Sequence, residues 1–537
     1  MQSLDRAFRA LAFTPLLILL VSCATPDSET RSVPTARAEK LLAEARHSRN
    51  TEARIGFALA AAEEAAGAIP ADDARLAYND ACVEIASEIW KSSGEITLPA
   101  TFSTPAGSFR LEFNPSRPTG VWNPSTFQKL IPTAEIKNQT FVSKGPVSGY
   151  GGALVGVSIP PDPRKLFLPE IGVSTAVTAV VGFSKPSQPG KPTRAILTLY
   201  DPAKRTSATI AGASRSLAAD YKAPFGYYPG ASSNGFLGML RPGKFMRKEG
   251  FFLVQPYDPD KIPIVFIHGL MSDPQIWLPM MASIESDPEL RRRYQFWVYA
   301  YPTGNPIAYS ALELRETLEA VYKTYPKSKD MVIVNHSLGG DLTHLQVIDT
   351  GNVLVEGIFK QNAPKILALP PDSTVRRGLQ FKANPRIERV VFIAAPHRGA
   401  PLAINSIGQF GAALIRLPGR VISQIGTATI MEAEEAAGIK KTFIPNSITG
   451  LEPDSPLLKS MNKVPIRVPF HSIIGVYGFP KEPLEKTSDT VVPYWSSHLD
   501  AALSEKLVPA PHTAIYEHPE TIAEVKRILR LNLRESK

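Results

Sequence analysis

The spacing of apolar residues is helical in the first part of the chain. Over residues 35–95, stretches such as EARIGFALAAAEEAAG and DDARLAYNDACVEIASEIW repeat small and apolar residues at helical intervals. In the second stretch Ile85, Ile89 and Trp90 fall on one face of a helix. The pattern predicts a small helical subdomain over residues 35–95.

The pattern changes over residues 100–225. Short β-type runs, among them SFRLEF, ALVGVSI, TAVTAVVGF and RAILTLY, are separated by segments rich in Pro and Gly. Many of the 49 prolines of the chain lie here and in the linkers. We expect a β-rich accessory domain without recognisable chemistry of its own.

Continuous apolar runs alternate with helical segments over residues 250–537. This alternation is typical of an α/β fold, in which a mostly parallel sheet is covered by helices on both faces. Residues 401–464 interrupt it with helical stretches and an apolar segment, NSITGLEPDSPLLKSMN. We therefore expect an insertion at that point.

Composition narrows the class of protein. The 537 residues are 44% hydrophobic and 20% charged, which is ordinary for a globular chain with room for two or three cores. A net charge of +9 favours anionic lipid surfaces, but no concentrated basic run accompanies it, so a generally basic exported protein is the simpler interpretation. There is no nucleic-acid-binding module and no phosphate-binding glycine loop, and we expect no nucleic-acid partner.

The first residues form a targeting segment. Arg6 and Arg9 precede an apolar run over residues 10–21, which is too short to span a bilayer. The run ends in LVSC, which resembles a bacterial lipobox. That resemblance implies a signal peptide at residues 1–22 and lipidation of Cys23. A plain signal peptide with a chance cysteine is the alternative.

The residues after this cysteine complete the expectation. Residues 23–34 are polar and turn-forming, as a tether between membrane and fold should be. Ala24 follows the cysteine in place of an aspartate, and by resemblance this implies the outer membrane of a bacterial cell envelope. The second cysteine, Cys82, lies in a helical pattern and is expected to be a small core residue.

Four motifs follow apolar runs in the last region. They are IPIVFIHGL at 262–270, VIVNHSLGG at 332–340, VVFIAAPHRG at 390–399, and SDTVVP at 488–493 with PHT at 511–513. Together they resemble the lipase/esterase type of α/β-hydrolase over about residues 250–533. A closer likeness, to GPI-inositol-deacylase-like and triacylglycerol-lipase-like enzymes, rests on NHSLGG and PHRG.

This resemblance implies an α/β-hydrolase fold and a serine ester hydrolase of the EC 3.1.1 type. Such an enzyme works through an acyl-enzyme with a Ser-Asp-His triad and needs no cofactor and no metal. The nine histidines of this chain are scattered, without an H-x-x-x-H or Cys-pair pattern for a metal. The implied substrate is a small-molecule ester or a lipid.

Ser337 is the expected nucleophile, because it lies at the turn between a strand and a helix. A serine hydroxyl needs an imidazole to remove its proton and a carboxylate to orient that imidazole. His512 follows the apolar run KLVPA and precedes the last helix, where the family places its base. His518 is the alternative, but it abuts Pro519 and is interpreted as the start of that helix.

Asp489 is the preferred acid. Its loop follows the apolar run HSIIGVYG and precedes the base. Asp500 and Asp454 are alternatives, and a purely turn-capping role for Asp489 stays open. Asp341, just inside the helix after the serine, is interpreted as favourable helix-dipole electrostatics.

The resemblance also assigns an oxyanion hole to the main-chain N–H groups of Leu338 and Leu270. Asn335 stands where the family carries the first glycine of its serine motif, and we expect it to be tolerated because Asn adopts unusual φ/ψ values. In lipase-like enzymes an insertion such as 401–464 is a cap or lid, and simple extra packing on the sheet is the alternative. His397 and Arg398 are expected in loop structure near the site.

Other functions use the same features. An acyltransferase or a phospholipase would carry the same triad. A non-catalytic envelope protein, in which the N-terminal regions bind a partner and the hydrolase fold is a scaffold, would have lost one of the three catalytic side chains. All three positions are filled here.

Overall fold

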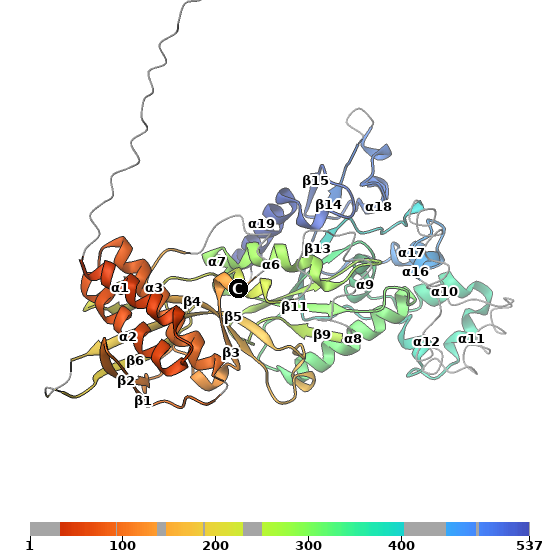
Figure 1. The fold of residues 1–537 in the computed structure, drawn as a ribbon. Coiled ribbons are helices and arrows are strands. Elements are labelled where there is room, and N and C mark those ends of the chain that lie inside the picture. Colours follow the sequence, from red (N-terminus) through yellow and green to blue (C-terminus); the bar gives the residue numbers. More distant parts are fainter. Residues whose placement is uncertain are drawn as a thin grey trace, which may run out of the picture.

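In the computed structural model, two sheets, each with its own helices, lie side by side (Figure 1). The structure describes residues 33–92, 94–136, 147–185, 188, 190–228, 250–401, 447–478 and 483–535. The expected signal peptide, the tether with Cys23, and most of the expected insertion lie outside the described residues. Within the described part of the chain, no helix combines the length and the apolar character needed to cross a membrane.

The N-terminal lobe, residues 33–228, pairs three helices with a six-stranded sheet of order β1-β2-β6-β5-β4-β3. The helices are α1 (Val33–His47), α2 (Thr51–Ala68) and α3 (Asp72–Lys91). The strands are β1 (Ala100–Thr104), β2 (Gly107–Phe113), β3 (Lys129–Pro132), β4 (Gly152–Ser158), β5 (Val173–Ser184) and β6 (Thr193–Tyr200). A hairpin of β7 (Ser207–Ile210) and β8 (Ala213–Ser216), and the short helix α4 (Ala223–Gly226), complete the lobe.

The helices and this sheet share one hydrophobic core. The backbones come so close that a Cβ on Gly152 of β4 would lie 2.6 Å from the backbone nitrogen of Val83 on α3. The buried Tyr78 hydroxyl donates to the carbonyl of Val181, 2.8 Å away, and ties α3 to β5. Cys82 is fully buried here, as expected, and burial raises the pKa of its thiol to about 12. The two N-terminal regions distinguished in the sequence thus form one packed unit.

The C-terminal domain, residues 250–535, is built on a seven-stranded sheet of order β15-β14-β13-β12-β10-β11-β9. Its strands are β9 (Gly250–Leu253), β10 (Ile262–Ile267), β11 (Tyr294–Ala300), β12 (Met331–His336), β13 (Ile387–Ile393), β14 (Phe470–Gly475) and β15 (Ser504–Val508). All neighbours pair in parallel except the edge strand β9, which is antiparallel to β11. This strand order is that of an α/β-hydrolase sheet, and the expected fold class is confirmed.

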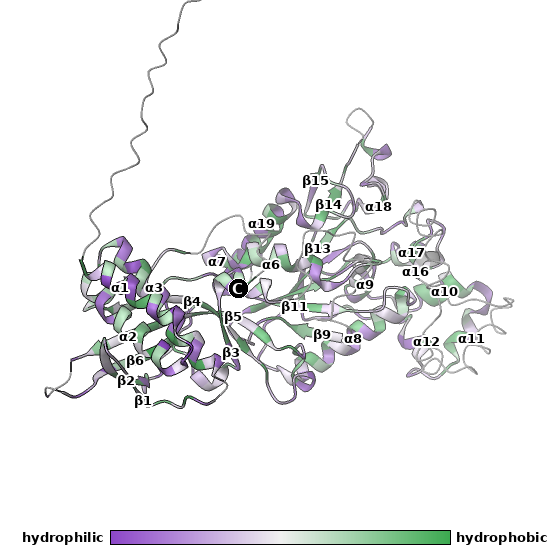
Figure 2. Ribbon diagram, viewed as in Figure 1, coloured by the Kyte–Doolittle hydropathy of each residue, from purple (hydrophilic) through white to green (hydrophobic). Residues whose placement is uncertain are grey.

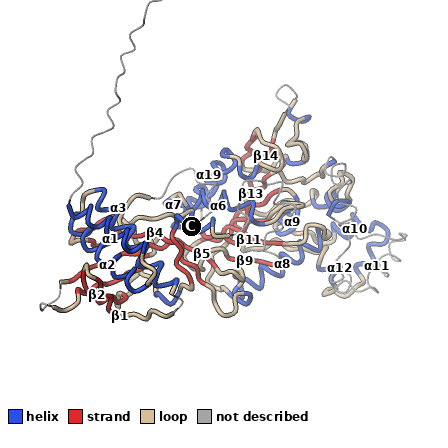
Figure 3. Tube along the Cα trace, viewed as in Figure 1, coloured by secondary structure: helices blue, strands red, loops and turns tan. Residues whose placement is uncertain are grey.

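Helices cover both faces of this sheet (Figure 3). The larger ones are α6 (Leu278–Glu285), α8 (Ile307–Thr324), α9 (Leu338–Gln346) and α19 (Pro519–Glu535). The shorter ones are α7 (Pro288–Arg293), α10 (Val353–Phe359), α11 (Ala363–Leu367), α12 (Thr374–Arg377), α16 (Ser447–Gly450), α17 (Pro456–Met461) and α18 (Tyr494–Ser497). Of the expected insertion, the described end carries α16 and α17, and α17 packs on α10.

The C-terminal domain has three layers, the sheet and the helices on each of its faces, because its strands carry apolar residues on both faces. Along β10, Val265 and Ile267 enter the core shared with α8 and α9, whereas Ile264 and Phe266 enter the core shared with α6 and α19. Successive residues of a strand point to opposite faces, so a strand buried on both faces is predominantly apolar. The ribbon coloured by hydropathy shows green sheet strands between helices of mixed colour (Figure 2).

The N-terminal lobe packs against the edge strand of the C-terminal domain. The N–H of Leu253 on β9 donates to the carbonyl of Phe167, 2.8 Å away. The buried hydroxyl of Tyr228 donates to the carbonyl of Val254 at 2.7 Å. An exposed strand edge invites unwanted pairing, and these contacts cover it.

Candidate active site

The turn between β12 and α9 places Ser337 at the carboxyl ends of the parallel strands, the edge at which α/β sheets bind their ligands. Its backbone has φ 53° and ψ −131°, a region that residues other than glycine rarely occupy. Its N–H donates to the carbonyl of Ile393, and its own carbonyl accepts from Gly340 at 2.7 Å. Strain of this kind persists when the surrounding structure holds it, and it is concentrated at functional sites.

Glycines allow three backbones to meet at this serine. A Cβ on Gly269 would lie 2.7 Å from the Cβ of Ser337, and a Cβ on Gly339 would lie 2.6 Å from the carbonyl oxygen of His268. A Cβ on Gly340 would lie 2.4 Å from that of Ala395. The turn after β10 therefore lies directly against the nucleophile candidate, and any larger side chain at these positions would separate them.

Asn335 does not have the role expected from the sequence. It is an ordinary β12 residue, paired with Ile267 and Phe392 in the sheet, and its φ is not positive. The expectation that its tolerance of unusual φ/ψ values matters is wrong, because the strain lies at Ser337 instead. Its buried side-chain amide has no hydrogen-bond partner within the described residues.

The structure brings Ser337, His512 and Asp489 together in one hydrogen-bonded chain. His512 Nε2 lies 2.9 Å from Ser337 Oγ, and His512 Nδ1 lies 2.6 Å from Asp489 Oδ2. All three side chains are buried. A carboxylate beside Nδ1 holds the proton there, which leaves Nε2 free to accept the serine proton.

The loops after β14 and β15 hold the second and third of these residues. The other oxygen of Asp489, Oδ1, accepts from the backbone N–H groups of Val491 and Val492 at 2.9 and 2.7 Å. The N–H of His512 donates to the carbonyl of Asp489 at 2.7 Å. Asp489 thus caps its own turn and faces the imidazole at the same time, so the capping role and the acid role are compatible.

The alternative residues lie elsewhere. Asp500 contacts His498, and Asp454 pairs with Lys459. His518 Nδ1 accepts from the N–H of Glu520 at the start of α19, as expected of a residue that begins a helix.

The two expected oxyanion donors flank the serine. Leu338 is the first residue of α9, where an N–H has no acceptor within the helix. Leu270 follows Gly269 in the turn that lies against Ser337. This turn is anchored by Tyr301, whose hydroxyl donates to the carbonyl of His268 at 2.9 Å and whose ring stacks on that histidine.

His336 is a residue of the site that the sequence alone did not indicate. Its Nε2 lies 3.0 Å from the carbonyl oxygen of His512, and the two rings are 4.7 Å apart. Burial, with the neighbouring His512 as a second cause, holds the pKa of His336 well below its usual range. The neutral ring can donate Nε2–H to that carbonyl, and so fixes the loop that carries His512. Its adjacency to Ser337 is the sequence signal that could have revealed it.

The loop after β13 is hydrogen-bonded to the segment that follows Asp489. Arg398 donates from Nη1 to the carbonyls of Trp495 at 2.8 Å and of His498. Its backbone N–H donates to Ser496 Oγ at 3.1 Å. These acceptors belong to α18 and the residue after it, which follow the Asp489 loop. Arg398 therefore lies in loop structure near the site, as expected.

A buried polar cluster lies along α9, just past the serine. Both carboxylate oxygens of Asp341 lack a hydrogen-bond partner within the described residues, and burial raises the pKa of this carboxyl well above its usual range. Burial also lowers the pKa of His344 to about 4. The buried ring of His397 lies against that of His344, with centroids 5.2 Å apart.

These environments change the interpretation of Asp341. A raised pKa disfavours the ionised form of this carboxyl, and this argues against the helix-dipole role expected from the sequence, which needs the negative charge. Among the described residues, no three His, Cys, Asp or Glu side chains are arranged to hold a metal ion.

Comparison with protein-family models and with curated proteins finds no match. Among solved structures, the mature lipase BlEst2 of Bacillus licheniformis is 16% identical, with a TM-score of 0.29, over 52% of this chain and 97% of that one. The metagenomic carboxyl esterase MGS0156 is 13% identical, with a TM-score of 0.31, over 52% and 78%. The enol-lactonase of Burkholderia xenovorans LB400 is 16% identical, with a TM-score of 0.27, over 51% and 92%. Likenesses this weak carry no argument, and the fold and chemistry rest on the strand order and geometry above.

The raised pKa of Asp341 has a measurable consequence for stability. Its folded pKa is raised, so its contribution is fully present below the unfolded pKa of about 4 and is lost as pH rises toward the folded pKa. Asp341→Asn is neutral at every pH. We expect the free energy of unfolding of this variant to increase relative to that of wild type as the pH rises, by at most about 1.4 kcal/mol per pH unit.

Urea unfolding at pH 5 and pH 8 measures this difference. Asp454→Asn is the matched control, because Asp454 is exposed and its pairing with Lys459 lowers its pKa, so its effect should be equal at both pH values. An Asp341→Asn effect that does not change with pH would contradict the prediction.

Proposed function

We propose that this protein hydrolyses carboxylic esters through an acyl-enzyme, with Ser337 as nucleophile, His512 as general base and Asp489 as the acid that orients it. The observation that carries the proposal is the hydrogen-bonded chain from Ser337 Oγ through His512 to Asp489. A strained turn presents the serine beside the turn after β10 and the loops after β14 and β15, which carry Asp489 and His512. Nucleophile, base and orienting group in mutual contact are the signature of a serine hydrolase.

Each group then has a defined task. His512 Nε2 takes the hydroxyl proton as Ser337 Oγ attacks the ester carbonyl, and Asp489 stabilises the imidazolium that forms. The N–H groups of Leu338 and Leu270 are the proposed donors to the tetrahedral oxyanion, and losing one such donor costs about 3 kcal/mol of barrier. His512 gives its proton to the departing alcohol, and a water activated by the same imidazole then releases the acid.

The substrate class follows from the sequence motifs more than from the geometry. The likeness of NHSLGG and PHRG to GPI-inositol-deacylase-like and triacylglycerol-lipase-like enzymes makes ester-linked lipids the first substrates to test. The same triad supports transfer of the acyl group to an alcohol other than water. Product analysis with an added alcohol separates transfer from hydrolysis.

The nucleophile is tested by Ser337→Ala. We expect the wild-type chain to be labelled by a fluorophosphonate probe and the variant to be unlabelled, because the probe reacts with an activated serine hydroxyl. Hydrolysis of p-nitrophenyl esters should fall by more than about a thousandfold. The exposed Ser103→Ala in the N-terminal lobe is the control and should keep both signals. A folded wild-type chain that resists the probe would overturn the proposal in favour of a non-catalytic scaffold.

His336 is proposed as a positioning residue, and His336→Phe tests it. Phenylalanine keeps an aromatic ring against His512 but cannot donate to its carbonyl. A lost hydrogen bond of this kind costs about 1 kcal/mol, which is roughly fivefold in rate. We expect kcat and the rate of probe labelling to fall together while KM stays unchanged. His336→Gln, which restores a donor, should recover part of the loss. A raised KM with unchanged kcat would instead assign His336 to the substrate pocket.

We also propose that Cys23 carries a lipid that anchors the protein to the bacterial cell envelope, on the outer membrane. The support is the LVSC motif after an apolar run, followed by Ala24. The full chain expressed in a bacterial host should incorporate radiolabelled palmitate, and Cys23→Ser should not. Cys82→Ser is the matched control and should keep the label, because Cys82 is buried. A wild-type chain without label would contradict the anchor.

A further inference from the structure

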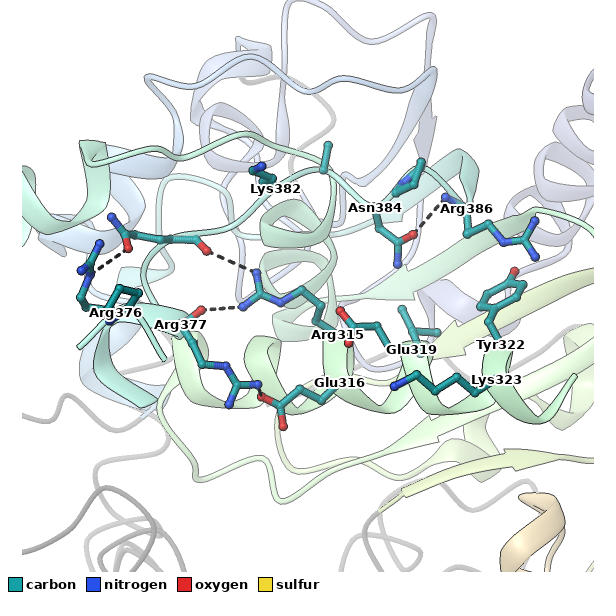
Figure 4. A pocket seen from close by; sticks show the side chains of 15 residues that line it. Arg315, Glu316, Glu319, Tyr322, Lys323, Arg376, Arg377, Lys382, Asn384 and Arg386 are labelled. Atoms are coloured by element: carbon teal, nitrogen blue, oxygen red, sulfur yellow. Dashed lines mark hydrogen bonds and ion pairs between the residues drawn. The ribbon is translucent and has the colours of Figure 1, made fainter. Parts of the chain in front are cut away.

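A cavity adjoins the amino end of β13, whereas the triad lies at the carboxyl ends of the strands. This cavity of about 880 Å³ opens between the polar face of α8 and the chain from Pro371 to Arg386 (Figure 4). Two glutamates and six cationic side chains line it, and we name it the basic pocket. The six cations are Arg315, Lys323, Arg376, Arg377, Lys382 and Arg386.

Part of this charge is neutralised within the pocket. Glu316 pairs with Arg377, and Arg315 is attracted to Glu319. Arg386 pairs with Asp330 at 2.8 Å, just beyond the wall. Glu316 is thus held in an ion pair, whereas Glu319 offsets the charge of Arg315 through its attraction alone.

Three cations remain after this pairing. No carboxylate of the described residues lies within ion-pair distance of Lys323, Arg376 or Lys382. Lys382 lies near Asp349, but Arg467 already pairs with that carboxylate at 3.0 Å. The pocket thus carries a surplus of about three positive charges, which attracts anions from solution.

Arg315 gives the pocket a fixed donor. Its guanidinium donates to the carbonyls of Arg377 and Gln380, and it lies 4.0 Å from the centre of the Phe381 ring. Burial lowers the pKa of this arginine. A cation held by carbonyls and a ring keeps its charge and loses little further freedom when an anion binds.

The location separates this pocket from the ester site. Arg386 immediately precedes β13, whereas the loop with His397 and Arg398 follows the other end of the same strand. Seven residues of strand span roughly 23 Å. The cavity is also far larger than an inorganic phosphate needs, and Tyr322 and Pro385 add apolar wall to it.

We propose that the basic pocket binds a ligand with several phosphate groups, either a soluble oligophosphate or the phosphorylated headgroup of a lipid. Clustered Lys and Arg side chains recognise phosphate through charge-assisted hydrogen bonds, with arginine forks and lysine point charges together. The surplus of cations matches a multiply charged anion, and the size of the cavity leaves room for the group that carries the phosphates.

Calorimetric titration of the purified full chain with tripolyphosphate tests this pocket, with inorganic phosphate as the smaller probe. We expect tripolyphosphate to bind more tightly than phosphate and more weakly as salt rises. Lys323→Glu/Lys382→Glu should weaken binding by about tenfold or more, since each lysine near a phosphate contributes a comparable attraction. The milder Lys323→Gln/Lys382→Gln should weaken it less. Thermal unfolding checks that both variants are folded.

The control is Lys129→Glu, an exposed lysine on β3 of the N-terminal lobe. Vesicles of phosphatidylcholine with and without cardiolipin, whose headgroup carries two phosphates, form the second arm. If the double variant loses tripolyphosphate binding but still binds the anionic vesicles as wild type does, the ligand is a soluble oligophosphate. If the double variant also loses binding to the anionic vesicles, the ligand is a lipid headgroup. No binding of either probe by wild type, or equal weakening by Lys129→Glu, would overturn the proposal.

Discussion

The backbone of Ser337 is held at φ 53° between the central strand β12 and the helix α9, a conformation that costs an L residue of order 1–3 kcal/mol. The parallel sheet offsets that cost: the neighbouring strand β13 fixes the serine N–H through Ile393, and α9 begins immediately afterwards. Close packing then depends on the absence of a Cβ at Gly269 and Gly340. With the turn fixed, the serine hydroxyl can meet an imidazole that arrives from a loop 175 residues further along the chain.

The electrostatics around the triad are arranged by burial. His336 packs against His512, and two cationic rings at 4.7 Å would repel each other. Burial keeps His336 neutral, so it donates a hydrogen bond to the backbone of His512 without opposing the imidazolium that the proposed reaction forms there. Burial likewise disfavours the charged form of Asp341. Asp489 is the carboxylate in direct contact with the imidazole of His512.

The two ends of the C-terminal sheet have different chemistry. The carboxyl ends of the strands carry the buried triad, with neutral histidines around it. The amino end of β13 adjoins a cavity lined by a surplus of cations. The N-terminal lobe contacts the β9 edge of this sheet through main-chain and tyrosine hydrogen bonds. These contacts do not involve the carboxyl ends or the amino ends of the parallel strands. One α/β domain thus presents two chemically distinct surfaces.

The alternation of apolar runs with helices in the sequence predicted an α/β fold, and the resemblance of four motifs to lipases and esterases implied its α/β-hydrolase form. The same resemblance indicated Ser337, Asp489 and His512, which the fold brings together because loops at the carboxyl ends of parallel strands converge. Only the tertiary structure decided the raised pKa of Asp341, the hydrogen bond from His336 and the shared core of the N-terminal helices and sheet. The dielectric around a side chain and the neighbours of a backbone carbonyl depend on elements far away in the chain. Asn335 shows this difference between sequence and tertiary structure. Its place in the serine motif predicted an unusual backbone conformation, whereas pairing within the sheet makes it an ordinary strand residue, and the strained backbone is that of Ser337.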